Sequence, residues 1–178
     1  AEWLKVIGYL TCREKDTDLW FDDIVSRYES LKNIYGNIKN RPTVFSDLPF
    51  EGQWYLPGGN SYIAQIFHDA GADYIWQDNN STASLPVDAE TVLSKAGNAD
   101  FWRVMNSTGH NITYKSLAAE NELYTYFKAF KDRHIIVCDI RKSGYFEKSE
   151  YEPDILLKDF VFAFHPEMVQ NEDYSPKY

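Results

Sequence analysis

The sequence predicts an α/β fold in which helices cover a parallel sheet on both faces. One observation is that short runs of β-branched and aromatic residues alternate with segments whose apolar residues recur at helical spacing. Another is composition: 178 residues with 44% hydrophobic and 16% aromatic content suit an ordinary domain with a real core. We divide the chain into a helical segment at residues 1–40 and an α/β lobe at residues 41–178.

The helical segment is predicted from a stripe of apolar residues that begins at Leu19 and recurs at steps near 3.5. Gly8 and the polar stretch from Thr11 to Thr17 indicate two helices or a kinked one. Arg41 and Pro42 stop the helix at about residue 40.

The lobe should contain four strands separated by helices. The strands are expected at Thr43–Phe45, Tyr74–Trp76, Phe101–Met105 and His134–Ile140. Asn60 or Ser61 is the predicted N-cap of one helix and Asp88 that of the next, and Pro153 suits the first turn of the last helix. A helix with Leu123, Phe127 and Phe130 on one face should precede the fourth strand. We expect the tail after Pro166 to be loose.

Candidate ligand-binding residues lie in the loops at 46–59, 77–86, 106–113 and 141–152. Each loop follows the carboxyl end of a predicted strand, where open parallel sheets bind ligands. Aromatic rings with a few hydrogen-bond donors suit a large planar or partly apolar ligand. The candidates are Trp54, Tyr55, Ser84, Asn106, Arg141, Tyr145 and Phe146. The alternative is that Trp54 and Tyr55 only fill the end of the sheet.

Evidence for other chemistry is weaker. The segment Pro57–Ser61 could place backbone N–H groups around an anion, but a tight turn before an ordinary N-cap is the favoured interpretation. The four histidines lack zinc-site spacing, so we predict neither a metal site nor a cofactor. Ser107, His110 and Asp139 could form a hydrolase triad, and an α/β hydrolase is the alternative function.

Charge and hydropathy exclude some classes of protein. A formal net charge of -9 and a pI near 4.9 argue against nucleic-acid binding. No apolar run approaches the ~20 residues that span a bilayer. Residues 1–7 read as the inside of a helix rather than a signal peptide, so any targeting signal is expected upstream. Cys12 and Cys138 are expected to be buried free thiols.

Three motifs, in order, resemble a known family. They are Gly58–Ala72, Val87–Leu93 followed by Asn98–Asp100, and Glu152–Asp159 followed by His165–Glu167. Together they resemble the second lobe of the periplasmic binding proteins that serve ABC importers of cobalamin and iron siderophores, with Ala99 where those proteins usually have proline. The segment from Trp3 to Asn40 looks like the end of the helix that joins the two lobes, plus its successor.

The resemblance implies a Rossmann-like, three-layer C-terminal lobe preceded by part of the interlobe helix. It implies a monomeric binding protein without enzyme activity, which captures cobalamin, haem or a ferric siderophore between this lobe and an N-terminal lobe outside the chain. Delivery would be to an ABC permease that docks at Asn60, where relatives carry glutamate, or at Glu51. It also implies a periplasmic or cell-surface location, with a lipid anchor preceding the chain.

Overall fold

The computed structural model describes residues 2–169 and 174–178. Within this part of the chain the main sheet has four strands in the order β3–β1–β5–β6, and all neighbours are parallel. The strands are β3 (Asp73–Tyr74), β1 (Thr43–Ser46), β5 (Phe101–Asn106) and β6 (Ile135–Asp139). The predicted parallel α/β architecture is therefore confirmed.

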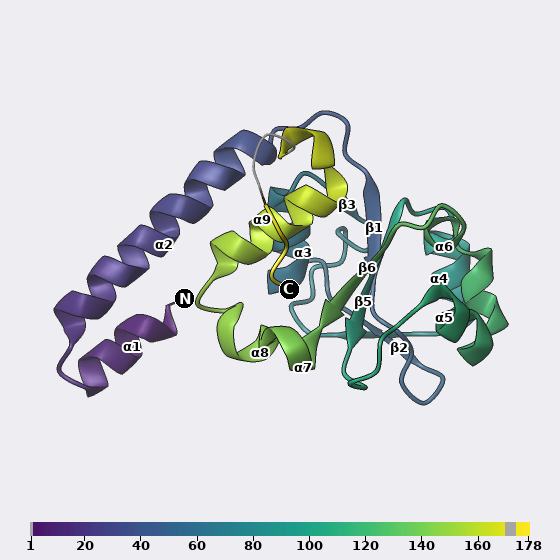
Figure 1. Ribbon diagram of the computed structural model, residues 1–178, viewed down its shortest axis with the longest axis horizontal. Coiled ribbons are helices and arrows are strands. Elements are labelled where there is room, and N and C mark those ends of the chain that lie inside the picture. The colour runs from purple at the N-terminus through teal and green to yellow at the C-terminus, as the bar shows by residue number, and fades with distance from the viewer. Residues whose placement is uncertain (1, 170–173) are drawn as a thin grey trace.

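Helices cover both faces of this sheet (Figure 1). One face carries α3 (Tyr62–Asp69) and α9 (Pro153–Phe164), which contact each other. The other face carries α4 (Ala89–Ala96), α5 (Tyr114–Glu120) and α6 (Lys128–Lys131).

The N-terminal segment forms two helices, α1 (Trp3–Leu10) and α2 (Glu14–Tyr35), which lie side by side. A side chain at Gly8 would place its Cβ 1.9 Å from Thr17 Oγ1, so glycine permits this close packing. The helix α2 packs against α9 and ends at Tyr35, earlier than the predicted boundary.

Buried aromatic rings fill the core on the α4–α6 side of the sheet. Phe45 stacks on Trp102 and on Phe127, with ring centroids 5.2 and 4.9 Å apart. Trp54 and Tyr124 meet Trp102 in tilted or edge-on geometry. Stacked and edge-on pairs of this kind add to the stabilisation from buried area.

The predicted helix starts are confirmed by their hydrogen bonds. Ser61 Oγ accepts from the backbone N–H of Ala64 at 3.3 Å, and Asp88 Oδ1 accepts from that of Thr91 at 2.8 Å. Each side chain satisfies one of the N–H groups that a helix start leaves without a partner. Pro153 opens α9 as expected.

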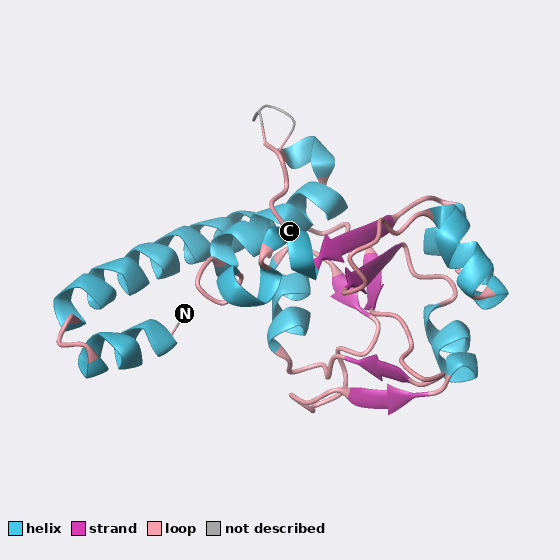
Figure 2. Cartoon of the chain, turned by 60° about the horizontal axis from the view of Figure 1, so that its bottom comes forward, coloured by secondary structure: helices cyan, strands magenta, loops and turns pink. Residues whose placement is uncertain are grey.

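Two loops that we expected to be irregular contribute a second, antiparallel sheet. It pairs β2 (Trp54–Leu56) with β4 (Leu85–Val87), as Figure 2 shows apart from the main sheet. The second predicted strand, expected at Tyr74–Trp76, is observed as β3 at Asp73–Tyr74, because the chain turns after Tyr74.

The helix expected before the fourth strand is broken into pieces. After α5, Asn121 is extended and its side chain accepts from the N–H of Leu123, which starts a 3-10 helix at Glu122–Tyr126. Phe127 is also extended and separates this helix from α6. The apolar periodicity is real, but local side-chain capping at Asn121 breaks the helix.

The segment after β6 is helical rather than a loop. It forms α7 (Ile140–Ser143) and α8 (Tyr145–Lys148), joined at Gly144, whose φ of 66° is left-handed. Asp139 accepts from the N–H of Lys142 and so caps α7.

The end of the tail is also more ordered than expected. After a 3-10 helix at Pro166–Met168, the backbone N–H groups of Lys177 and Tyr178 donate to Asp159 at 3.0 and 2.8 Å. The Tyr178 hydroxyl donates to Glu152 at 2.7 Å. Residues 174–178 therefore bind along α9, whereas residues 170–173 lie outside the described part of the chain.

Of the two free cysteines, only Cys138 is buried as expected. Cys12 is exposed because it forms the turn between α1 and α2 with a φ of 55°. None of the helices that the structure describes is long and apolar enough to cross a bilayer.

Candidate ligand-binding site

Two neighbouring pockets lie at the carboxyl edge of the sheet, where the predicted ligand loops meet. Their volumes are about 530 and 470 Å³, and Asp47, Tyr55 and Met105 line both. Because they share these residues, the two pockets adjoin each other, and together they are called the sheet-edge recess; the segments after β1 and β5 form it and, in the larger pocket, so do α7 and α8. Open parallel sheets bind ligands at this edge.

A buried ion pair lies at the base of the larger pocket. The Arg103 side chain on β5 is only 4% exposed, and its Nη1 donates to Ser46 Oγ at 3.0 Å and lies 3.4 Å from Asp47 Oδ1. Its Nη2 donates to the Tyr145 hydroxyl at 3.1 Å. Burial raises the pKa of the Asp47 carboxyl, while Arg103 and the hydrogen bond from Ser46 oppose that shift. The guanidinium charge is therefore already compensated within the protein.

The backbone of Asp47 organises the aromatic core beneath the pocket. Its carbonyl oxygen accepts from Trp54 Nε1 at 3.0 Å and from Trp102 Nε1 at 2.8 Å. Its N–H donates to the Arg103 carbonyl at 2.7 Å, and its φ of 68° lies in the left-handed region. Two buried indoles therefore share one acceptor, which also holds the Asp47 side chain over the sheet edge.

Trp54, which we expected to face the ligand, is instead fully buried. Side chains alternate along a strand, so β2 points Trp54 into the core and Tyr55 outward. Tyr55 is 48% exposed and lines both pockets. The alternative interpretation, that a ring fills the end of the sheet, applies to Trp54 alone.

The larger pocket brings together four of the predicted ligand-binding residues. Tyr55 and Phe146 present exposed rings, and Tyr145 contributes its buried phenol. Ser84, which directly precedes β4, also lines the pocket. That these residues contact a ligand stays a prediction.

Asn106 and Arg141 have other surroundings. Asn106 is 1% exposed, and its Nδ2 donates to the carbonyl of His110 at 2.7 Å while its Oδ1 accepts from the N–H of Thr108 at 3.1 Å. Asn106 therefore holds the loop after β5 in place from within. Arg141 is exposed on α7 and lines neither pocket.

The glycines before α3 serve backbone packing rather than anion binding. The N–H groups of Gly58 and Asn60 donate to the carbonyls of Ala83 and Ser81, so they are not free for an anion. A Cβ at Gly58 would lie 2.2 Å from the Ser81 carbonyl oxygen, which requires glycine there. The favoured tight-turn interpretation agrees with this geometry.

The two residues considered for permease docking are both exposed. The Asn60 side chain donates to the carbonyl of Asn80 at 3.1 Å, which ties it to the neighbouring loop. Glu51 lies in the turn between Phe50 and Gln53, with a φ of 51°. The carboxylate of Glu51 thus projects from a tight turn.

The residues of the hypothetical triad are not arranged as one. Asp139 accepts from Asn106 Nδ2 and from the N–H of Lys142, and the latter bond lowers the pKa of Asp139. No hydrogen bond joins Ser107, His110 and Asp139 to one another in the part of the chain that the structure describes. Nor do three His, Cys, Asp or Glu side chains gather there as a possible metal site.

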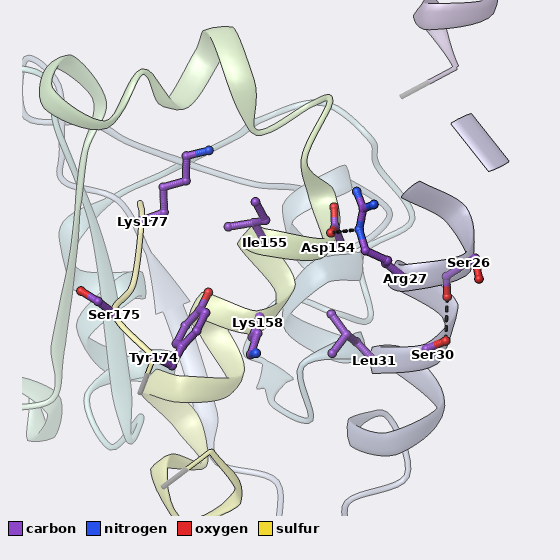
Figure 3. A pocket seen from close by; sticks show the side chains of 10 residues that line it. All are labelled: Ser26, Arg27, Ser30, Leu31, Asp154, Ile155, Lys158, Tyr174, Ser175 and Lys177. Carbon is purple, nitrogen blue, oxygen red and sulfur yellow. Dashed lines mark hydrogen bonds and ion pairs between the residues drawn. The ribbon is translucent and has the colours of Figure 1, made fainter. Parts of the chain in front are cut away.

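Another pocket, of about 620 Å³, lies between α2, α9 and the tail (Figure 3). Arg27, Lys158 and Lys177 line it, and Arg27 Nε donates to Asp154 at 2.7 Å. Its lining comes from α2, α9 and the tail, and none of the predicted site residues lines it. The sheet-edge recess is therefore the stronger candidate for ligand binding.

Sequence analysis missed Asp47, Arg103 and Tyr62. Arg103 was assigned to a strand without a role, although a charged residue inside an otherwise apolar strand indicates a buried partner. Tyr62 lines the larger pocket and its hydroxyl donates to the carbonyl of Ser149 at 3.1 Å. Asp47 directly follows β1, which is the signal that would have identified it.

The chain is similar in sequence to longer curated proteins. An uncharacterized lipoprotein of Methanocaldococcus jannaschii is 29% identical over 94% of the chain but only 39% of its own length. The chain spans about two fifths to a half of the length of the curated relatives it matches.

Two solved structures have the same fold at low sequence identity. The ABC-type Fe3+-hydroxamate transport system of Saccharomonospora viridis gives a TM-score of 0.72 at 16% identity, covering 92% of this chain and 54% of that one. IsdE of Staphylococcus aureus, solved in complex with haem, gives 0.69 at 16% identity, covering 92% and 63%. The family model described as periplasmic binding protein matches residues 1–141, which is most of the chain. The chain therefore belongs to the periplasmic binding protein family.

Proposed function

We propose that this chain is the C-terminal ligand-binding lobe of the substrate-binding component of an ABC importer for a metal chelate. The observation that carries the proposal is the sheet-edge recess, where exposed aromatic rings lie above the buried polar cluster of Asp47, Arg103 and Tyr145. The chain belongs to a family of binding proteins, which supports a ligand in this recess. The chelate would be a corrinoid, haem or a ferric siderophore, held between this lobe and a second lobe of the same protein. Residues 1–40 would form the connection between the lobes.

The names of similar proteins support this class of cargo. One structural neighbour is described as an Fe3+-hydroxamate transport system, and another was solved with haem. Two curated relatives are named lipoproteins, which supports a lipid-anchored protein outside the cytoplasm.

The roles of the lining residues follow from their exposure. Tyr55 and Phe146 are 48% and 64% exposed, so their rings are available to lie against a large chelate. The Tyr145 hydroxyl accepts from Arg103 and keeps its own proton for a ligand oxygen. Ser84 adds a hydroxyl at the margin of the pocket.

Ligand binding is tested with the full-length product of the gene that encodes this chain. Cobinamide, haemin and ferrioxamine B are titrated separately, and quenching of tryptophan fluorescence reports binding. We expect at least one to bind, and we expect Phe146→Ala to weaken that binding by about tenfold through loss of an aromatic contact. Tyr126→Ala is the matched control, since Tyr126 is 55% exposed but lines neither pocket. Absence of binding by all three chelates would refute the proposal.

Permease docking is tested separately through Glu51, the exposed carboxylate at the turn after β1. We propose that the permease docks either at Asn60 or at Glu51, whose carboxylate would pair with basic residues of the permease. Glu51→Lys should reduce uptake by vesicles that contain the cognate permease while leaving chelate affinity unchanged. A loss of chelate affinity in this variant would instead place Glu51 in the ligand site.

A further inference from the structure

Carboxylates outnumber cations around the sheet-edge recess. Asp47 lines both pockets, Glu150 the larger one and Glu120 the smaller one. Among the described residues that line them, Arg103 in the larger pocket is the basic side chain, and His110 in the smaller pocket is a further titratable group. The chain as a whole carries a formal net charge of -9. Both the recess and its surroundings therefore favour positive over negative ligands.

The charge of Arg103 does little to change this balance. The guanidinium is 4% exposed and already lies beside the Asp47 carboxylate, with Ser46 and Tyr145 accepting its hydrogen bonds. Its Nη atoms are therefore compensated before a ligand arrives, while its buried Nε has no hydrogen-bond partner among the described residues. The guanidinium is thus a poor receptor for additional negative charge.

The carboxylates at the margin have no basic partner among the described residues, although Glu120 accepts a hydrogen bond from the Tyr124 hydroxyl. Glu150 lines the larger pocket and Glu120 the smaller one, both are exposed, and neither forms an ion pair with a residue that the structure describes. The cations of α7 border the smaller pocket but not the larger one: Lys142 Nζ donates to Asn111 Oδ1 at 2.7 Å and lies 3.5 Å from Asp139, and Arg141 lies beside Gly109. In the larger pocket, the unpaired charge that a ligand meets is therefore that of Glu150, which is negative.

We propose that this lobe selects chelates that are uncharged or cationic and discriminates against polyanionic ones, such as ferric tris-catecholates. This inference rests on the proposed function and narrows its substrate class. At an effective dielectric constant of about 20, one unit charge roughly 10 Å from another changes affinity by about tenfold. A trianionic complex should therefore bind at least tenfold more weakly than a cationic complex of similar size.

The experiment compares ferrioxamine B, a cationic ferric hydroxamate, with ferric enterobactin, a trianionic tris-catecholate, on the full-length gene product. Affinities are measured by tryptophan quenching at low and at high salt. The cationic complex should bind more tightly, and its advantage should shrink at high salt because screening weakens charge interactions. Tighter binding of the trianion would overturn the inference and leave the proposed function standing, whereas failure of both complexes to bind would count against both.

Two variants in which a glutamate is replaced by lysine test whether charges on this lobe set the selectivity between the two complexes. Glu150→Lys should shift the ratio of the two affinities toward the trianion by about tenfold or more. Glu147→Lys is the matched control, because Glu147 is exposed on α8 but lines neither pocket. An equal shift in the control, or no shift in Glu150→Lys, would show that the pocket charges do not set the selectivity.

Discussion

Replacing Arg103 by methionine should destabilise the fold strongly, because it removes one half of a buried ion pair. The change leaves the Asp47 carboxylate, 21% exposed as a side chain, without its counterion. It also removes the donors to Ser46 and Tyr145. Breaking a buried pair from one side costs about 3–5 kcal/mol, a large share of the roughly 5–15 kcal/mol that stabilises a domain.

A double-mutant cycle separates the pair from the packing of either side chain. Asp47→Asn alone should also destabilise, since it leaves a buried guanidinium without a carboxylate. The double variant should lose less than the sum of the single losses, with a coupling of about 1–3 kcal/mol. Urea unfolding, followed by tryptophan fluorescence and circular dichroism, gives each free energy. Arg141→Met is the matched control and should change stability by less than about 0.5 kcal/mol, because Arg141 is exposed. Additive losses in the double variant would refute the reasoning.

The loss caused by Arg103→Met should also depend on pH. Burial raises the pKa of Asp47 above its ordinary value of 3.8, and Arg103 opposes that shift. Without Arg103 the pKa of Asp47 in the folded state therefore rises further. A group whose pKa is raised by folding contributes stability below its unfolded pKa, and loses that contribution as the pH rises through the folded value. The variant should thus be closest to the unaltered protein near pH 4 and fall behind it as the pH rises toward neutrality.

Three further outcomes follow from the described contacts. Trp54→Phe should lower the free energy of unfolding and leave chelate affinity unchanged, whereas Tyr55→Ala should weaken chelate binding and leave the free energy of unfolding nearly unchanged. Urea unfolding measures the stability of both variants and fluorescence titration measures their chelate affinity. Weaker binding by Trp54→Phe would contradict the buried position of Trp54. Gly58→Ala should destabilise the protein by about 1–3 kcal/mol or more in urea unfolding, because its Cβ meets a backbone carbonyl that has little room to move. Cys12 should react with a thiol reagent in the folded protein, whereas Cys138 should react only on unfolding, because burial both shields its thiol and raises its pKa; rapid modification of both would contradict this.

The order of elements could be predicted because local signals determine it. The N-caps Ser61 and Asp88 act within three residues of their own position, and Pro153 acts on the first turn of its own helix. The parallel sheet follows from the alternation of such elements rather than from any contact between them. The same local reasoning failed at Asn121, where a capping side chain competes with the apolar periodicity.

The second sheet could not be predicted in the same way. The strands β2 and β4 are three residues each and lie about thirty residues apart, so neither contains enough alternation to show its pairing. Their pairing decides which way each side chain of β2 points. The sequence could therefore name Trp54 and Tyr55 as a pair, but the structure was needed to assign one to the core and the other to the pocket.

Asp47 and Arg103, at the polar base of the site, could not be predicted from the sequence, whereas the aromatic residues in the loops could. Exposed aromatic residues in loops are recognisable one at a time, since each is unusual for its position. The pairing of Asp47 with Arg103 exists only because β1 and β5 are neighbours in the sheet, with Ser46 in register with Arg103. That register places Arg103 beside the carboxylate at the end of β1, and the carbonyl of the same Asp47 anchors two buried indoles. The charge of the site and the packing of the core thus depend on one residue, so a substitution at Asp47 should change ligand selectivity and stability together.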